Sequence, residues 1–180
     1  MINPTTKHGV LNDWDMGYYE PLSRGKAGGE RTGTLPFMAL DLLTDEAWKG
    51  NVQRLYRHDL EGFIWILPWV LLQFEGSKRT NCQLAGWETG DFEQCAEKKR
   101  GLFSKLRSGN IATASWKAEW QLAKILLGWL QREEGDRVMK PKELSPKDVF
   151  NRFYETLCIA RETYEPLGKL MHQLKLTSID

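Results

Sequence analysis

Apolar residues recur at helical spacing along much of the chain, and this pattern predicts a mostly helical protein. The clearest stripe is made by Trp116, Trp120, Ala123, Leu127 and Leu130. Intervals of three and four residues place such side chains on one face, so residues 115–131 are expected to form an amphipathic helix. Residues 92–106 are expected to form another helix, which carries several lysines and arginines.

A last helix is expected to begin after Ser145. This serine can cap the helix, Pro146 suits the first helical position, and Asp148 stands three residues after the cap. The apolar face of this helix is supplied by Val149, Phe150, Phe153, Leu157 and Ala160. Pro166 is expected to end it, and the charged residues 135–142 before it are expected to form a linker.

The longest apolar run extends from Phe63 to Leu72 and is interrupted only by Pro68. It is about half of the roughly 20 residues that a membrane span needs. Residues 58–74 are therefore expected to form a helix that is buried on all sides after its first turn, and no membrane partner is expected. Because proline removes a backbone donor, a kink or a restart is expected at Pro68.

The first part of the chain has a different character. Residues 8–14 predict a short buried strand, residues 17–34 a glycine-rich charged loop, and residues 41–48 a short helix capped by Thr44. Residues 75–91 are polar and rich in turn-forming residues. The expectation is a single mostly α domain over residues 1–180 with one or two short N-terminal strands, in which residues 44–180 form the helical core.

Composition narrows the classes of function. The net charge is +1, so no strong field attracts nucleic acid. The basic cluster of Lys98, Lys99, Arg100, Lys105 and Arg107 is interleaved with acids and is expected to be a solvated helix face. Three widely spaced cysteines favour neither disulfides nor a zinc site, which favours a reducing, intracellular and cytoplasmic location. The N-terminus has no signal-peptide pattern.

Three segments carry candidate chemistry. Asp13, in Asp13-Trp14-Asp15, follows an apolar strand and opens the glycine-rich loop, where a carboxylate can hold Mg²⁺. Taken alone, the motif is also compatible with two acids in a solvated turn. The second segment runs from Gly33 and Thr34 through Leu35-Pro36-Phe37-Met38-Ala39-Leu40 to Asp41, and the third is residues 56–61, which contains Asp59. The simpler interpretation of Asp59 is a helix cap or first-turn acid.

In this order and spacing, the three segments resemble the C-lobe of a protein kinase, and most closely the fungal-type protein kinase family. Residues 8 to about 75 carry the resemblance. It implies that Asp13 binds the Mg²⁺ of ATP. It implies that Gly33 and Thr34 belong to the shelf for the protein substrate, and that residues 1–43 form the metal-binding strand and activation-loop-like segment. Asp41 matches an acid that pairs with a buried arginine, for which Arg107 and Arg137 are candidates.

The resemblance also implies that Asp59 is buried and accepts backbone hydrogen bonds from a catalytic loop, because a buried carboxylate needs such partners. The cofactors that it implies are ATP and Mg²⁺, and the partners are a protein substrate, or a partner protein, and the missing N-lobe.

Other parts of a kinase do not occur in these 180 residues. The sequence contains neither a Gly-x-Gly-x-x-Gly loop nor a His-Arg-Asp motif, and only twelve residues precede Asp13. The chain is therefore expected to be an N-terminally truncated kinase that is inactive alone. Two alternatives stay open: a non-catalytic, pseudokinase-like interaction module, and a small-molecule phosphotransferase. The substrate-shelf segment from Gly33 to Asp41 argues against the second.

Overall fold

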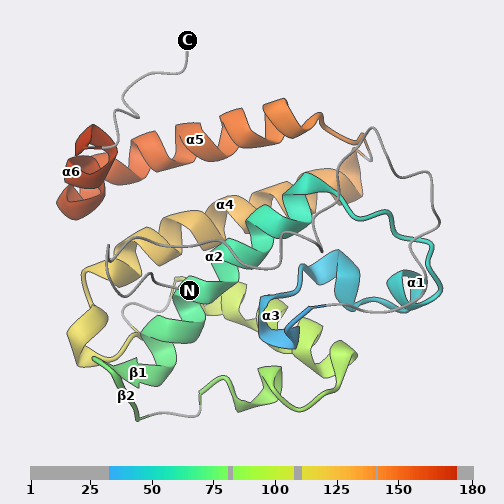
Figure 1. Ribbon diagram of the computed structural model, residues 1–180, viewed down its shortest axis with the longest axis horizontal. Helices are drawn as coiled ribbons and strands as arrows, with labels where there is room; N and C mark the ends of the chain where they lie inside the picture. The colour runs from blue at the N-terminus through green and yellow to red at the C-terminus, as the bar shows by residue number, and fades with distance from the viewer. Residues whose placement is uncertain (1–32, 81–82, 108–110, 141, 174–180) are drawn as a thin grey trace, which may run out of the picture.

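The structure is a computed structural model that describes residues 33–80, 83–107, 111–140 and 142–173 (Figure 1). Its α-helices are α1 (Asp45–Trp48), α2 (Tyr56–Gln73), α3 (Phe92–Lys105), α4 (Glu119–Met139), α5 (Pro146–Thr163) and α6 (Glu165–Gln173). Short 3₁₀ helices lie between them: η2 (Leu35–Phe37), η3 (Leu40–Leu43), η4 (Ala85–Trp87) and η5 (Ala114–Trp116). The mostly α fold that the sequence predicts is confirmed.

Three long helices form the body of the fold. Helices α2, α4 and α5 lie side by side, and each runs opposite to its neighbour (Figure 1). Helix α3 packs against α4, η2, η3 and η4, so the η2–η3 segment is held between α2 and α3. Helix α6 turns back against the end of α5.

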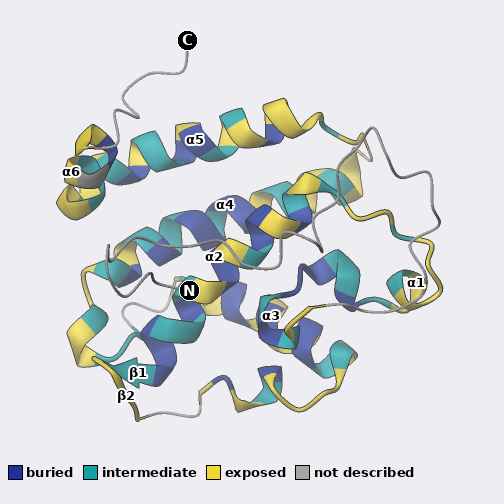
Figure 2. Cartoon of the chain, in the orientation of Figure 1, coloured by how far each residue is buried: buried dark blue, intermediate teal, exposed yellow. Residues whose placement is uncertain are grey.

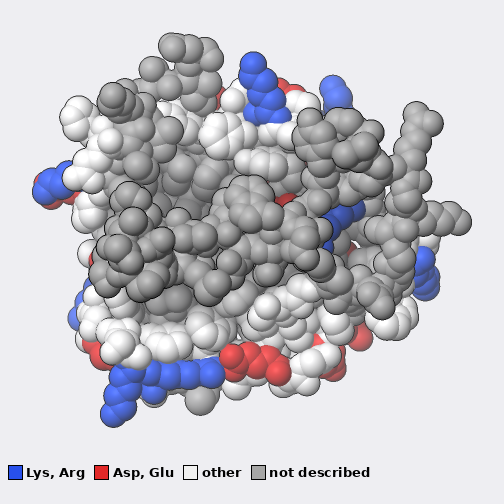
Figure 3. Space-filling view, viewed as in Figure 1, with Lys and Arg blue, Asp and Glu red and all other residues white. Residues whose placement is uncertain are grey.

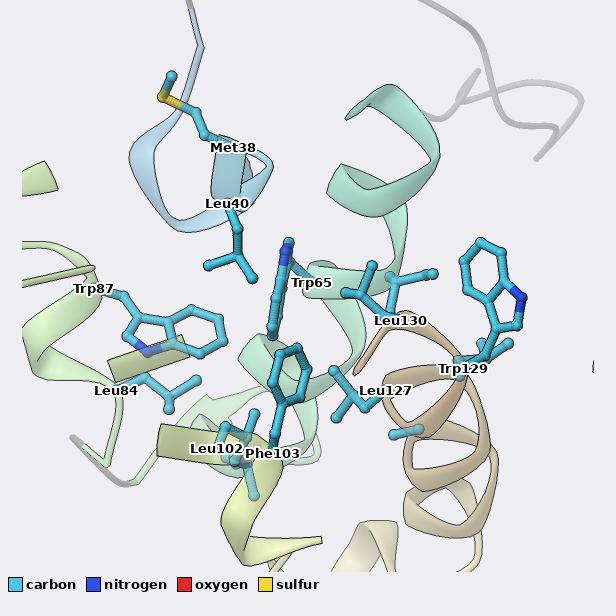
Figure 4. Close-up of a cluster of buried hydrophobic side chains, with 14 of the residues drawn as sticks. Met38, Leu40, Trp65, Leu84, Trp87, Leu102, Phe103, Leu127, Trp129 and Leu130 are labelled. Carbon is cyan, nitrogen blue, oxygen red and sulfur yellow. The ribbon is translucent and has the colours of Figure 1, made fainter. Parts of the chain in front are cut away.

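Trp65 stands at the centre of the core (Figure 4). Its ring packs edge-on against Trp87, with centroids 5.4 Å apart, and at 5.7 Å from Phe103. Leu40 of η3 lies on the same side of this indole as Trp87, and Leu127 and Leu130 of α4 lie on the other side (Figure 4). Aromatic rings remove large apolar areas from water. The core therefore joins α2, α3, α4 and the η2–η3 segment into one unit.

Helix α2 forms where the sequence predicts it and runs through Pro68 without a break. The expectation that it is buried on all sides is wrong. Phe63 is 63% exposed and Ile66 is 39% exposed, whereas Ile64 and Trp65 are buried. Figure 2 shows buried and exposed residues alternating along α2. Since successive residues are about 100° apart on a helix, these side chains lie on opposite faces, and only one face meets the core.

Side chains cap the start of both α3 and α5, and Ser145 is the cap predicted for α5. The Asp91 side chain accepts the amide of Gln94, and the Ser145 hydroxyl accepts the amide of Asp148. Thr44 likewise caps α1 by accepting the Ala47 amide. Each cap satisfies an amide that the helix itself leaves without a partner.

Helix α4 extends further than predicted, because residues 135–139 of the expected linker are helical. Two ion pairs tie its C-terminal half to its neighbours. Glu133 contacts Arg152 of α5 at 3.3 Å, and Glu134 contacts Arg100 of α3 at 3.0 Å. Both glutamates lie just before the expected linker, and their ion pairs hold this half of α4 against its two neighbours.

Proline and strand positions also differ from expectation. Helix α5 ends before Pro166, which instead lies in the first turn of α6, where no backbone N–H is needed. The strands of the described part are β1 (Phe74–Glu75) and β2 (Lys78–Arg79), which form a hairpin directly after α2. Gly76, with φ of 58°, makes its turn. The strand expected over residues 8–14 lies outside the described residues.

The described part of the chain contains no helix with the length and apolar character needed to cross a membrane.

Candidate functional site

The segment Leu35–Asp41, here called the anchored segment, is the more buried part of the predicted substrate shelf, which begins at the exposed Gly33 and Thr34. The Thr34 carbonyl accepts the Phe37 amide at 2.8 Å and starts η2, and Pro36 suits the first turn because it needs no donor there. Between Phe37 and Leu40 the chain is extended, with Met38 and Ala39 buried. Extended, buried backbone cannot satisfy its own polar groups, so these must find partners elsewhere.

Glu61 of α2 supplies the first partner. Its Oε1 accepts the Leu40 amide at 2.7 Å and the Trp65 indole N–H at 3.0 Å. Glu61 is only 2% exposed, and burial raises the pKa of its carboxyl. Such a group is retained inside a protein when hydrogen bonds compensate its lost hydration. Glu61 therefore fixes the anchored segment to the helix that carries the central tryptophan.

Lys99 of α3 supplies the second partner. Its Nζ donates to the Met38 carbonyl at 2.5 Å and lies 4.9 Å and 5.4 Å from the ring centroids of Trp65 and Trp87. Aromatic faces stabilise a cation at such distances. The side chain is fully buried, and this burial lowers the pKa of Lys99 to about 8. The expectation that Lys99 belongs to a solvated face is therefore wrong.

Backbone contact and ring packing hold the middle of the segment. A Cβ on Gly62 would lie 2.8 Å from the Phe37 carbonyl oxygen, so only glycine allows α2 to approach η2 this closely. The Phe37 ring packs edge-on against Trp69 at 5.6 Å. Cys95 of α3 is buried and its Sγ lies 3.8 Å from the Leu35 carbonyl oxygen. The anchored segment is thus packed against both α2 and α3.

Asp41 ends the anchored segment in an ion pair. Its Oδ2 lies 2.6 Å from Nη1 of Arg57 and 3.6 Å from Nε2 of His58. Because Nδ1 of His58 accepts the Leu55 amide, the imidazole proton is on Nε2, facing Asp41. His58 and the Arg57 guanidinium outweigh burial and hold the pKa of the Asp41 carboxyl well below its usual range. Arg57 also donates from Nε to Glu143 at 3.0 Å.

The arginine that pairs with Asp41 is therefore neither of the two predicted. Arg107 follows α3 and is exposed. Arg137 is nearer: it lines a cavity of about 30 Å³ together with Arg57 and Glu61, and its charge helps to lower the pKa of Asp41. Arg57 stands at the start of α2, sixteen residues beyond Asp41 in sequence. The fold brings its guanidinium within 2.6 Å of the Asp41 carboxylate, so the short Asp side chain reaches it directly.

Asp59 is not buried as the resemblance implied. Its side chain is 60% exposed, and its Oδ1 lies 3.6 Å from Arg54. Asp59 and Glu61 are two positions apart, which corresponds to about 200° around a helix. Because Glu61 points into the core, Asp59 points outward. The role of Asp59 in holding a catalytic loop stays a prediction, because the residues before Gly33 lie outside the described part.

The remaining predicted site residues lie at the edge of the described structure or beyond it. Gly33 and Thr34 are exposed at the leading end of the anchored segment, and Gly33 has φ of 143°, which disfavours any side chain there. Asp13, the predicted Mg²⁺ ligand, lies outside the described residues. Among those that are described, no three His, Cys, Asp or Glu side chains cluster as metal ligands.

Sequence reasoning missed Glu61 and Lys99, although a signal for each was present. Lys99 follows Cys95 by four residues and precedes Leu102 and Phe103, which places a cation on the apolar stripe of its helix. Glu61 stands at the start of the apolar run. A charged residue in phase with buried neighbours indicates a group that is paired inside the protein.

Comparison with known proteins agrees with the motifs in the first part of the chain. A model of the family described as fungal protein kinase matches residues 1–71. The predicted resemblance to this family is thereby confirmed over that part, which includes the anchored segment and most of α2. No curated protein and no solved structure gives a significant match to the chain.

The Asp41→Asn variant tests the ion pair. Neutralising Asp41 leaves Arg57 without its closest anion, so we expect the free energy of unfolding at pH 7 to fall by about 1–3 kcal/mol. The folded-state pKa of Asp41 is below its unfolded value of 3.8. Its stabilisation is therefore present above about pH 4 and is lost as the pH falls further.

Urea unfolding followed by tryptophan fluorescence at pH 7 and at pH 2.5 measures both effects. The difference between wild type and Asp41→Asn should shrink at the lower pH. Asp59→Asn, which neutralises an exposed carboxylate near the same helix start, is the matched control and should change stability by less than about 0.5 kcal/mol. Equal effects of the two variants at pH 7 would contradict the assigned pair.

The Lys99→Met variant tests the buried cation. The pKa of folded Lys99 is about 8, below the 10.5 of an ordinary lysine. Between these values the unfolded chain binds more protons than the folded one, so Lys99 makes stability rise with pH. Relative to Lys99→Met, wild type should gain up to about 1.4 kcal/mol per pH unit above pH 8.

Urea midpoints at pH 7.5, 8.5 and 9.5 measure this gain. The contributions of other titrating groups cancel in the difference between the two proteins, because both contain these groups. Lys98→Met, which removes the exposed neighbouring lysine, should track wild type at every pH. Parallel pH profiles for wild type and Lys99→Met would show that the Lys99 pKa is not lowered.

Proposed function

We propose that this chain is the substrate-binding C-lobe portion of a fungal-type protein Ser/Thr kinase, which transfers phosphate from ATP to a protein. In this proposal Asp13 holds the Mg²⁺ of ATP, and Gly33 and Thr34 meet the protein substrate. The 180 residues contain no Gly-x-Gly-x-x-Gly loop and no His-Arg-Asp motif. Those parts supply most of the positioning and charge stabilisation in phosphoryl transfer, so the chain transfers no phosphate by itself.

The anchoring of Leu35–Asp41 is the observation that supports this proposal. A shelf for a peptide substrate must keep its shape while the substrate binds, because misplacement of reacting groups reduces the rate steeply. Glu61, Lys99 and Arg57 fix the segment at three successive points. Its leading residues, Gly33 and Thr34, are left exposed at the surface. A rigid base with an accessible edge suits the binding of an extended polypeptide.

A second function, a pseudokinase-like interaction module, is favoured by one feature of α2. Tyr56, Phe63 and Ile66 lie on one face of the helix and are 41%, 63% and 39% exposed. An exposed apolar stripe, interrupted here by Asp59 between Tyr56 and Phe63, is typical of protein interaction sites. A partner protein that covers this stripe would be bound without any phosphoryl transfer.

A phosphorylation assay tests the expected inactivity. The purified chain, incubated with radiolabelled ATP, Mg²⁺ and a mixture of protein substrates, should incorporate no more label than a sample without it. Asp13→Ala is the matched control and should give the same background. ATP-dependent labelling that disappears in Asp13→Ala would contradict the proposal that the chain is inactive alone.

The 5′ end of the native transcript separates the two functions. An in-frame glycine-rich loop, strand lysine and His-Arg-Asp…Asn stretch upstream of Met1 would support the kinase. The longer product should then phosphorylate proteins and leave choline and aminoglycosides unmodified. A transcript that starts at Met1 would favour the interaction module.

A further inference from the structure

A groove separates η4 from the outer face of α3. It has a volume of about 190 Å³, and its walls include Leu84, Trp87 and Leu102. These three side chains are at most 6% exposed, so the walls are already packed and rigid. The groove lies on the far side of α3 from Arg100, which pairs with α4.

Two lysines of α3, Lys98 and Lys105, line this groove. Seven residues on a helix correspond to about 20° of rotation and 10.5 Å of rise, so both side chains stand on one face. Both are exposed. The structure gives neither lysine an acidic partner among the described residues, whereas the neighbouring Arg79 and Arg100 pair with Glu88 and Glu134.

The acids of α3 do not neutralise these lysines. Glu97 and Glu93 are displaced from Lys98 by about 100° and 140° around the helix, and both are exposed. Their charges therefore face away from the groove. Arg100 lies on the same side of the helix as Glu93 and pairs with Glu134 of α4, so Lys98 and Lys105 are the cations of α3 that line the groove.

Gly86 shapes the opening on the η4 side. A Cβ at this position would lie 3.1 Å from Cγ and 3.4 Å from Cε of Lys98. The absence of a side chain lets the lysine stem lie across η4, so its position at the groove is set by packing. Long lysine stems commonly cover apolar surface while the ammonium stays in water.

We propose that the groove between η4 and α3 binds an extended acidic segment of a partner protein, through Lys98 and Lys105. The two lysines are about 10.5 Å apart along the helix, and an extended chain advances about 3.3 Å per residue. In a segment with polyproline II geometry, side chains three positions apart point to the same side and are about 9 Å apart. The partner segment therefore carries two acidic residues three positions apart, with small residues between them. This binding does not depend on phosphoryl transfer by the chain.

The groove fits a peptide better than a nucleic acid. Proteins that bind single strands offer aromatic faces on which bases stack. Trp87, the aromatic residue of the groove, is 1% exposed and packs edge-on against Trp65. The groove offers two lysine cations, which can pair with carboxylates. It offers no exposed aromatic ring on which nucleic-acid bases could stack.

Fluorescence polarisation with the full chain tests the proposal. The probe is a labelled twelve-residue peptide with two Asp residues three positions apart, and the reference peptide has Asn at both positions. The acidic peptide should bind at least tenfold more tightly, and its affinity should fall as salt is added. The variant Lys98→Glu/Lys105→Glu should lose this preference, and it should bind a peptide with Lys in place of both Asp residues.

Lys117→Glu/Lys147→Glu is the matched control, because it reverses two exposed lysines outside the groove and changes the net charge equally. It should keep at least half of the wild-type affinity, and thermal melting should show both double variants folded. Equal binding of the acidic and Asn peptides would overturn the proposal. So would equal losses in the two double variants, or tighter binding of a single-stranded oligonucleotide than of the acidic peptide through the same two lysines.

Discussion

Two buried side chains of opposite charge, Glu61 and Lys99, hold the anchored segment, and the rest of the candidate site depends on them. The extended stretch at Met38–Leu40 passes through the core, where water cannot satisfy its backbone. Glu61 takes the Leu40 amide and Lys99 takes the Met38 carbonyl. Both charged groups also contact Trp65, so the contacts that satisfy the backbone are built into the centre of the core.

The Asp41–Arg57 pair extends the same arrangement to the surface. Arg57 and Glu61 are one turn apart on α2, so a single helix holds both the middle and the end of the segment. The ion pair is partly exposed and therefore contributes less than a fully buried contact. The stabilisation is thus weaker at Asp41 than at Leu40, and at its other end the segment is preceded by the exposed Thr34.

The sequence predicts the long helices well: an apolar run indicates α2, apolar periodicity indicates α4, and the Ser145 cap with Pro146 indicates α5. It does not predict which face of α2 stays exposed, because a continuous apolar run has no periodicity that would identify the buried face. The extension of α4 depends on ion pairs with α3 and α5, which are contacts in space rather than patterns in sequence. The motifs identify the segment that ends at Asp41, but the Arg57 partner becomes visible only once α2 is placed.

Hydrogen exchange at the Leu40 amide tests this account most directly. In the wild-type chain this amide should be as protected from exchange as the Leu71 amide in α2, because its hydrogen bond to Glu61 opens only when the core unfolds. In Glu61→Leu, which keeps an apolar side chain but removes the acceptor, Leu40 should exchange at least a hundredfold faster relative to Leu71. In Glu61→Gln, which keeps an acceptor oxygen, most of the protection should remain. A Leu40 amide that exchanges at the same rate relative to Leu71 in wild type and Glu61→Leu would contradict the anchoring of this segment by Glu61.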